Sequence, residues 1–156
     1  MRRACWLMIL VGCTSLPSQQ ASGPQAVVSL KRGACRGGCP EYAVYLSADG
    51  RVVFVGFRNV KATGISTSNV NPQRVREVIA RFEQSGYAQL PDQYTMGSAA
   101  CGRYASDAPV VETSLLNQSS FKTVLRDGGC SGSPAILREL EQLIDEVAQT
   151  ARWVGP

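Results

Sequence analysis

The sequence predicts an α+β domain in which two helices pack on one face of an antiparallel sheet. Two observations lead to this class. The predicted elements follow the order strands, helix, strands, helix, without the strand-by-helix alternation that builds a parallel sheet. The strand segments alternate between polar and apolar residues, whereas the helical segments carry apolar stripes with the helical period. We expect about four to six short strands.

The first half of the domain begins with strands. Val27–Leu30 is a short apolar strand, and Glu41–Ser47 alternates in polarity. The turn residues 48–50 (Ala-Asp-Gly) separate it from the β-branched and aromatic segment Arg51–Phe57. These two segments therefore form a β-hairpin. Thr63–Ser66 adds a further short strand.

A helix follows these strands. Asn71 supplies a capping side chain and Pro72 occupies the first helical position. Gly86 is placed to end the helix. The side chains expected on its buried face are Val75, Val78, Ile79 and Phe82.

The second half repeats the order. Residues 89–109 contain several Pro and Gly residues and predict a loop. Val110–Leu116 and Ser120–Arg126 form a second hairpin, and Ser133 caps a second helix ahead of Pro134. That helix buries Ile136, Leu137, Leu140, Leu143, Ile144 and Val147. Its polar face carries Arg138, Glu139, Glu141, Gln142, Asp145 and Glu146.

The N-terminal segment has the pattern of an export signal. Arg2 and Arg3 precede a short apolar run that closes on Leu10–Cys13. Those four residues (Leu-Val-Gly-Cys) resemble the lipobox of bacterial lipoproteins, which implies that Cys13 becomes a lipid-modified N-terminus. The expected organisation is a signal peptide over residues 1–12, a flexible tether over residues 13–25 and one domain over residues 26–156.

Two other interpretations of this segment are an ordinary signal peptide and a membrane-spanning helix. A span needs about 20 apolar residues, whereas polar residues follow directly after Cys13. An Ala-x-Ala cleavage pattern is absent. The lipoprotein interpretation predicts a membrane-anchored protein of the bacterial cell envelope. Thr14, which is not aspartate, resembles outer-membrane sorting, with the domain on the periplasmic face if the host has two membranes.

The composition excludes several function classes. The chain contains no histidine, so it can build neither a Ser-His-Asp nor a Cys-His catalytic unit, nor most catalytic zinc sites. The formal net charge is +4, and Arg2 and Arg3 supply two of these charges. The remainder is too small to indicate nucleic-acid binding. We expect no cofactor, and we interpret Lys31, Arg32 and Arg36 as a solvated loop.

Four cysteines of the domain predict disulfides. Cys35, Cys39, Cys101 and Cys130 are an even number in an exported domain and allow three pairings. We favour Cys35–Cys39 and Cys101–Cys130, because glycines in residues 36–38 permit a tight turn. The chain-entropy model assigns about 2 kcal/mol to the first bridge and about 3.5 kcal/mol to the second. A four-thiolate zinc site is the alternative, although the spacing differs from C-x-x-C.

Two catalytic hypotheses remain beside the structural interpretation. Cys35 and Cys39 could form a reactive dithiol, with Arg32 and Arg36 stabilising a thiolate, but no helix is expected after the pair. Carboxylates could hydrolyse glycans if two of them faced one cleft. The candidates are Glu41, Asp92, Asp107, Glu112 and Asp127, of which Asp107 and Asp127 are typical of turns.

Residues 35–42 (Cys-Arg-Gly-Gly-Cys-Pro-Glu-Tyr) show the spacing C-x-G-x-C-P-x-Y at the start of a predicted hairpin. This motif resembles an uncharacterised bacterial domain family. The likeness spans Val28 to Val154, and Cys101 and Cys130 lie outside its motif. It implies a fold and a membership but no reaction.

The sequence therefore predicts a lipid-anchored envelope protein with a non-catalytic binding or scaffolding domain. Its partner would be another envelope protein, a peptide or a glycan. The rival hypothesis is a thiol-redox or histidine-independent hydrolytic envelope enzyme.

Overall fold

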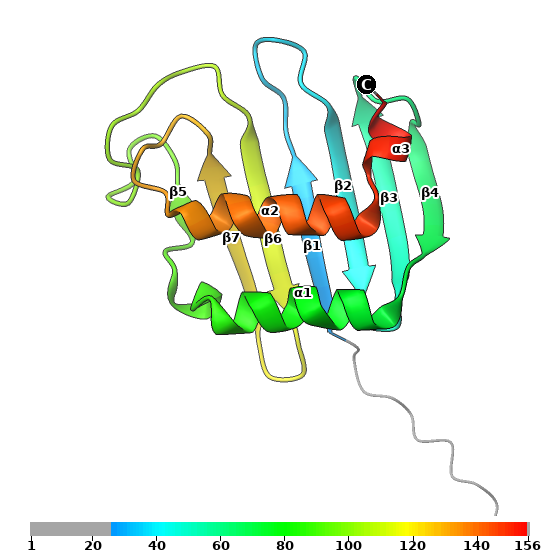
Figure 1. Ribbon diagram of the computed structural model, residues 1–156. Helices are drawn as coiled ribbons and strands as arrows, with labels where there is room; N and C mark the ends of the chain where they lie inside the picture. The colour runs from blue at the N-terminus through cyan, green and yellow to red at the C-terminus, as the bar shows by residue number, and fades with distance from the viewer. Residues whose placement is uncertain (1–25, 156) are drawn as a thin grey trace, which may run out of the picture.

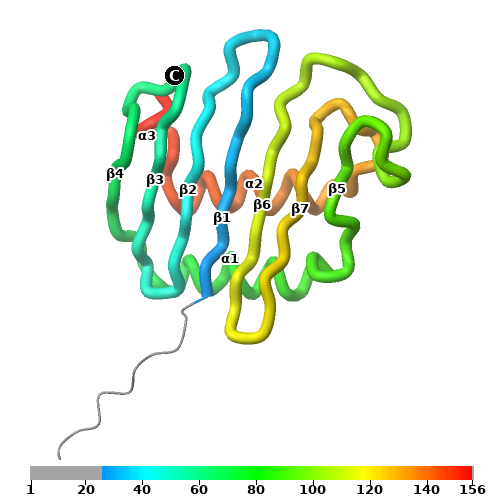
Figure 2. Tube along the Cα trace, turned by 180° about the vertical axis from the view of Figure 1, so that it is seen from behind, coloured from blue at the N-terminus to red at the C-terminus, as the bar shows by residue number. Residues whose placement is uncertain are grey.

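The computed structural model describes residues 26–155. Two main helices lie across one face of a seven-stranded sheet (Figure 1), and the view from behind shows the opposite face without a covering helix (Figure 2). The strands are β1 (Val27–Arg32), β2 (Glu41–Ser47), β3 (Arg51–Arg58), β4 (Gly64–Asn69), β5 (Gln93–Tyr94), β6 (Val110–Leu116) and β7 (Phe121–Asp127). The helices are α1 (Pro72–Gln84), α2 (Ala135–Ala148) and the short α3 (Ala151–Val154), with a 3-10 turn η1 at Tyr87–Gln89.

The strand order is β4-β3-β2-β1-β6-β7-β5, and all pairs are antiparallel except β5 with β7. The α+β class is confirmed, but the expected number of four to six strands is wrong. The additional strand is β5, which lies within residues 89–109, a segment predicted to be a loop. Two residues are too few to show the alternation by which a strand is recognised from sequence.

Helix α1 has the predicted start and the predicted buried face. The side-chain Oδ1 of Asn71 accepts a hydrogen bond from the Gln73 N–H at 2.9 Å, and Pro72 is the first helical residue. Gly86 follows the helix with a positive φ of 74°. The four residues of the expected stripe are all buried: Val75, Val78, Ile79 and Phe82.

Helix α2 differs from the prediction in two respects. Its N-cap is Pro134, which provides no side-chain cap, and the Ser133 hydroxyl donates to the Cys130 carbonyl at 3.1 Å instead. Its buried face includes Glu141, whereas Ile136 and Leu143 are only half-buried. The predicted apolar stripe is therefore displaced toward Glu141, because an arginine of the sheet lies opposite that carboxylate.

The core lies between the helices and the sheet and contains several aromatic contacts. The ring of Tyr87 meets Phe82 edge-on at 4.7 Å between centroids, and its hydroxyl donates to the Thr113 carbonyl at 2.6 Å. On the other side of the core, Trp153 stacks on Phe54 with centroids 5.0 Å apart. These contacts anchor η1 and α3 to the two ends of the helical layer.

Tyr87 predicts a loss of stability at alkaline pH. Burial raises its pKa from an ordinary value of 10.0 to about 12, although its hydrogen bond with Thr113 acts in the opposite direction. An unfolded tyrosine ionises first, so this contribution is complete below pH 10 and is lost as pH rises toward about 12. We expect the free energy of unfolding to fall less over this range in a Tyr87→Phe variant, as measured by urea titration.

The matched control is Tyr45→Phe at an exposed site, which should keep the wild-type pH dependence. An identical alkaline fall in the wild type and in Tyr87→Phe would contradict the assignment.

Candidate functional site

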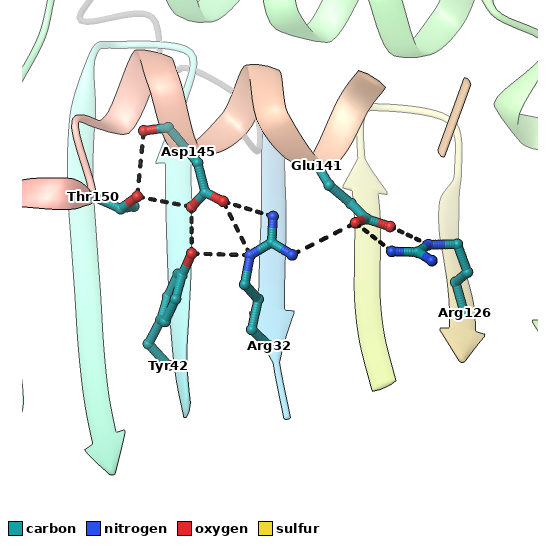
Figure 3. A network of polar contacts seen from close by, with 6 residues as sticks. All are labelled: Arg32, Tyr42, Arg126, Glu141, Asp145 and Thr150. Carbon is teal, nitrogen blue, oxygen red and sulfur yellow. Dashed lines mark hydrogen bonds and ion pairs between the residues drawn. The ribbon is translucent and has the colours of Figure 1, made fainter. Parts of the chain in front are cut away.

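Six polar side chains form a network between α2 and the sheet (Figure 3): Arg32, Tyr42, Arg126, Glu141, Asp145 and Thr150. Asp145 is the centre of one half. The Arg32 guanidinium donates to Asp145 Oδ2 at 3.0 and 2.7 Å. The hydroxyls of Tyr42 and Thr150 donate to its other oxygen at 2.7 and 2.8 Å. Both oxygens of Asp145 are thus occupied.

Glu141 is the centre of the other half. The Arg126 guanidinium binds it in a bidentate manner at 2.6 and 2.7 Å, and both side chains are less than a tenth exposed. Arg32 Nη1 lies 3.6 Å from Glu141 Oε2 and joins the two halves. Within residues 26–155, no buried side-chain nitrogen or oxygen lacks a hydrogen-bond partner.

The electrostatics of this network fix its protonation states. Burial by itself would lower the pKa of Arg32, but the charge of Asp145, the neighbouring Tyr42, the hydrogen bond to Asp145 and the charge of Glu141 together outweigh burial and raise it. Burial and the same carboxylate raise the pKa of Tyr42 well above its usual range. At neutral pH the arginine is charged and the tyrosine is protonated, so neither exchanges protons readily. The network fastens α2 to the sheet.

The sequence did not predict this network, because Glu141 and Asp145 were assigned to the polar face of the helix and Arg32 to a solvated loop. Arg32 is instead the last residue of strand β1 and is paired with Asp145. A signal was nevertheless present. Arg32 follows Val28 and Leu30 at two-residue spacing, so a strand that continued past Leu30 had to direct Arg32 toward the helices. A buried cation at that position requires an opposing carboxylate.

The disulfides gather at one end of the domain. The structure joins Cys35 to Cys39 in the β1–β2 loop and Cys101 to Cys130, the pairing favoured from sequence. Arg36 of the first loop lies 3.3 Å from Asp107 of the long β5–β6 loop. Both loops stand at the top of Figure 1, opposite the first residue of β1. Cys13 lies outside the described residues.

The structure disfavours the dithiol hypothesis on local grounds. The two arginines considered as thiolate partners, Arg32 and Arg36, both pair with carboxylates. Residues 39 and 40 lead into strand β2 and not into a helix. The group that donates to Cys35 Sγ is the backbone N–H of Cys39, at 3.2 Å.

The structure brings two of the five candidate carboxylates together: Asp92 and Glu112 line one hollow of about 390 Å³. Three pair with cations: Glu41 with Arg58, Asp92 with Lys122, and Asp107 with Arg36. Asp127 accepts the Gly129 N–H at 2.8 Å, as expected of a turn residue. Glu112 stands half-buried on the face of the sheet away from the helices. In the hollow that Asp92 and Glu112 share, Asp92 is engaged by Lys122, which lines the same hollow.

The uncovered face of the sheet, called the open face below, is the candidate binding surface. Strand register places its side chains in rows, one of which runs Thr67, Val53, Tyr45, Ser29, Ser114 and Thr123. The hydroxyls of Ser29 and Ser114 are hydrogen-bonded at 2.6 Å at its middle. Large apolar side chains stand on this face, with Tyr45, Phe121 and Ile65 exposed by 43%, 68% and 74%.

A shallow hollow of about 280 Å³ lies on the open face over β1 and β6. The aromatic rings of Tyr45 and Phe121 stand on two sides of it, and Ser29 and Ser114 form its floor. Lys31 and Glu112, which face each other across β1 and β6, border the hollow with opposite charges. A hollow with aromatic walls and a polar floor is suited to binding a ligand, since it offers both apolar area and hydrogen-bonding groups.

Comparison with known proteins identifies one family. A family model described as "Domain of unknown function (DUF6438)" matches residues 26–148. No match was found among curated proteins. Within residues 26–155, no cluster of three metal-ligating side chains was found, and no helix is long and apolar enough to cross a membrane.

The buried network predicts a sharp contrast between two glutamates of α2. Glu141→Ala leaves Arg126 buried without its carboxylate and should lower the free energy of unfolding by about 3–5 kcal/mol. Glu139 makes an exposed pair with Arg81, and Glu139→Ala should cost less than about 1 kcal/mol. Urea denaturation followed by circular dichroism measures both values. Equal losses for the two variants would contradict the assignment of the network as the main attachment of α2.

Proposed function

The chain belongs to the DUF6438 family, whose function is unknown, and from this premise we propose that it is a lipid-anchored binding or scaffolding module of the cell envelope. The binding surface is the open face of the sheet. The partner is another envelope protein, a peptide or a glycan. The module works without a catalytic step.

The observation that carries this proposal is that the helices cover only one face of the sheet. Antiparallel sheets commonly leave one face to solvent, and that face is then mostly polar. Here Tyr45, Ile65 and Phe121 stand exposed on it. Exposed apolar groups that gather on one face of a domain are typical of interaction surfaces.

The anchor proposed at Cys13 suits a surface of this kind. The described chain starts with β1 at one end of the sheet, and the disulfide loops are at the other end (Figure 1). A tether over residues 13–25 would reach about 40 Å when extended. The open face runs between these two ends, so an anchored domain would present it side-on to partners along the membrane.

The first test concerns the anchor. We expect Cys13→Ala to release the protein from the membrane fraction, because the thiol that would carry the lipid is lost. Cys5→Ala is the matched control and should leave the protein attached, since Cys5 lies within the proposed signal peptide. Fractionation of cells followed by immunoblotting measures the distribution. Retention of Cys13→Ala in the membrane fraction would refute the anchor.

The second test concerns the open face. A photo-crosslinking residue at position 45 should yield one discrete adduct, whereas the same residue at position 139, on the exposed side of α2, should not. The partner identified in this way should bind a Tyr45→Ser/Phe121→Ser variant at least tenfold more weakly, because aromatic contacts often dominate interfaces. Calorimetry with the purified partner measures this. Unchanged affinity in the double variant would reject the open face as the binding surface.

A further inference from the structure

The outer edge of the sheet carries unpaired backbone groups in strand β4, which lies at the margin of the sheet in both views (Figures 1 and 2). The N–H of Val70 donates to the Gly50 carbonyl at 2.9 Å, directly beyond the Arg51–Asn69 pair. In an antiparallel ladder, hydrogen-bonded pairs alternate with non-hydrogen-bonded pairs. The N–H and C=O groups of Ile65, Thr67 and Asn69 therefore point away from β3, toward the free edge.

This edge lacks the protection that proteins usually give to an outer strand. Charged residues and proline commonly prevent pairing at exposed edges. Strand β4 (Gly-Ile-Ser-Thr-Ser-Asn) contains neither. At the opposite edge, β5 covers Leu125 and Arg126 of β7, and Lys122 of β7 pairs with Asp92. The two edges of the sheet are therefore unequal.

The side chains beside β4 form an apolar strip on the open face. Ile65 is 74% exposed and is aligned with Val55 of β3 and Ala43 of β2. Val53 is aligned with Thr67 in the next row. A residue placed opposite Ile65 on an added strand would lie on this face. An apolar residue at that position would extend the strip.

The charges around the edge are predominantly positive. Lys61 lies in the β3–β4 turn, Arg51 is aligned with Asn69 at the other end of β4, and Arg152 of α3 donates to the Ser68 hydroxyl. Arg58, the last residue of β3, is paired with Glu41. Asp49 is the acidic residue nearest in sequence to Arg51, and its carboxylate accepts the Arg51 N–H. The surroundings of β4 thus favour a partner with carboxylates.

We propose that β4 binds an extended segment of a partner protein as an eighth strand of the sheet. The segment carries an apolar residue opposite Ile65 and carboxylates near Arg51 and Lys61. The main-chain hydrogen bonds supply affinity, and these side chains supply specificity. The proposal deepens the binding function proposed above, on which it rests, by naming the class of partner and where it binds.

A second copy of this chain is the less suitable occupant. An antiparallel pair of β4 strands related by a two-fold axis at Thr67 would bring the Lys61 turn of one copy to the Arg51 end of the other. Like charges placed together in this way oppose association. An acidic segment from a different protein meets attraction at both ends.

The experiment uses the purified chain and two synthetic nine-residue peptides in which valine alternates with threonine. In one peptide the first two and the last two of the nine residues are glutamates, and in the other they are lysines. We expect the glutamate peptide to bind at least tenfold more tightly than the lysine peptide in calorimetric titration. Amide NMR signals of Ile65, Thr67 and Asn69 should shift most on binding.

Thr67→Pro tests the backbone contact. Proline removes the central outward N–H without removing a bond to β3, a position at which edge strands tolerate proline. The variant should lose at least tenfold in affinity for the glutamate peptide, whereas Thr67→Val, which keeps the N–H, should bind like the wild type. Ile65→Asp leaves the backbone intact and should also lower the affinity for the glutamate peptide at least tenfold. This second variant keeps the test valid if Thr67→Pro fails to fold.

The outcomes separate this proposal from the one above. Wild-type affinity in both Thr67→Pro and Ile65→Asp would overturn the assignment of the edge. A wild-type dimer that becomes monomeric in Thr67→Pro would assign the edge to a second copy and overturn the proposed occupant. Peptide binding that survives in Tyr45→Ser/Phe121→Ser supports the edge even if the central open face proves to have no partner.

Discussion

The attachment of α2 to the sheet through two carboxylates, the buried Glu141 and the half-buried Asp145, is the interaction on which the rest of the fold depends. Glu141 and Asp145, one helical turn apart, bind Arg126 of β7 and Arg32 of β1. These contacts fix both the rotation and the position of the helix over the sheet. Because a buried charge without its partner is strongly unfavourable, the pairing selects one packing arrangement, and the aromatic contacts of the core then fill the space that this arrangement defines.

The elements of the fold follow from local patterns, which explains why most of them could be predicted. The Asn71-Pro72 cap and the alternation in Glu41–Ser47 are properties of neighbouring residues and appear in the structure at nearly the expected positions. Glu141 could not be assigned in this way, because its burial depends on Arg126, a residue of a different element. The short strand β5 is likewise formed by pairing with β7 and not by its own two residues.

The candidate sites divide in the same way, into those that depend on neighbouring residues and those that depend on contacts between elements. The disulfide Cys35–Cys39 could be predicted from the spacing of its cysteines, since the loop between them is short and contains two glycines. The open face was not, because alternation shows that a strand has two faces but does not show which of them the helices cover. Tyr45 and Phe121 are outside the core for this reason: they belong to rows of the sheet opposite α1 and α2.

The unequal edges of the sheet have a consequence for stoichiometry. A flat sheet with two free edges can propagate without limit, as in fibrils. In this domain β5 and the ion pair of Lys122 with Asp92 obstruct one side, so among the strands of residues 26–155 growth by strand addition is left to β4. Each molecule can therefore terminate a chain of strands but cannot continue one. Within residues 26–155, the sheet therefore limits an edge-mediated complex to a finite assembly.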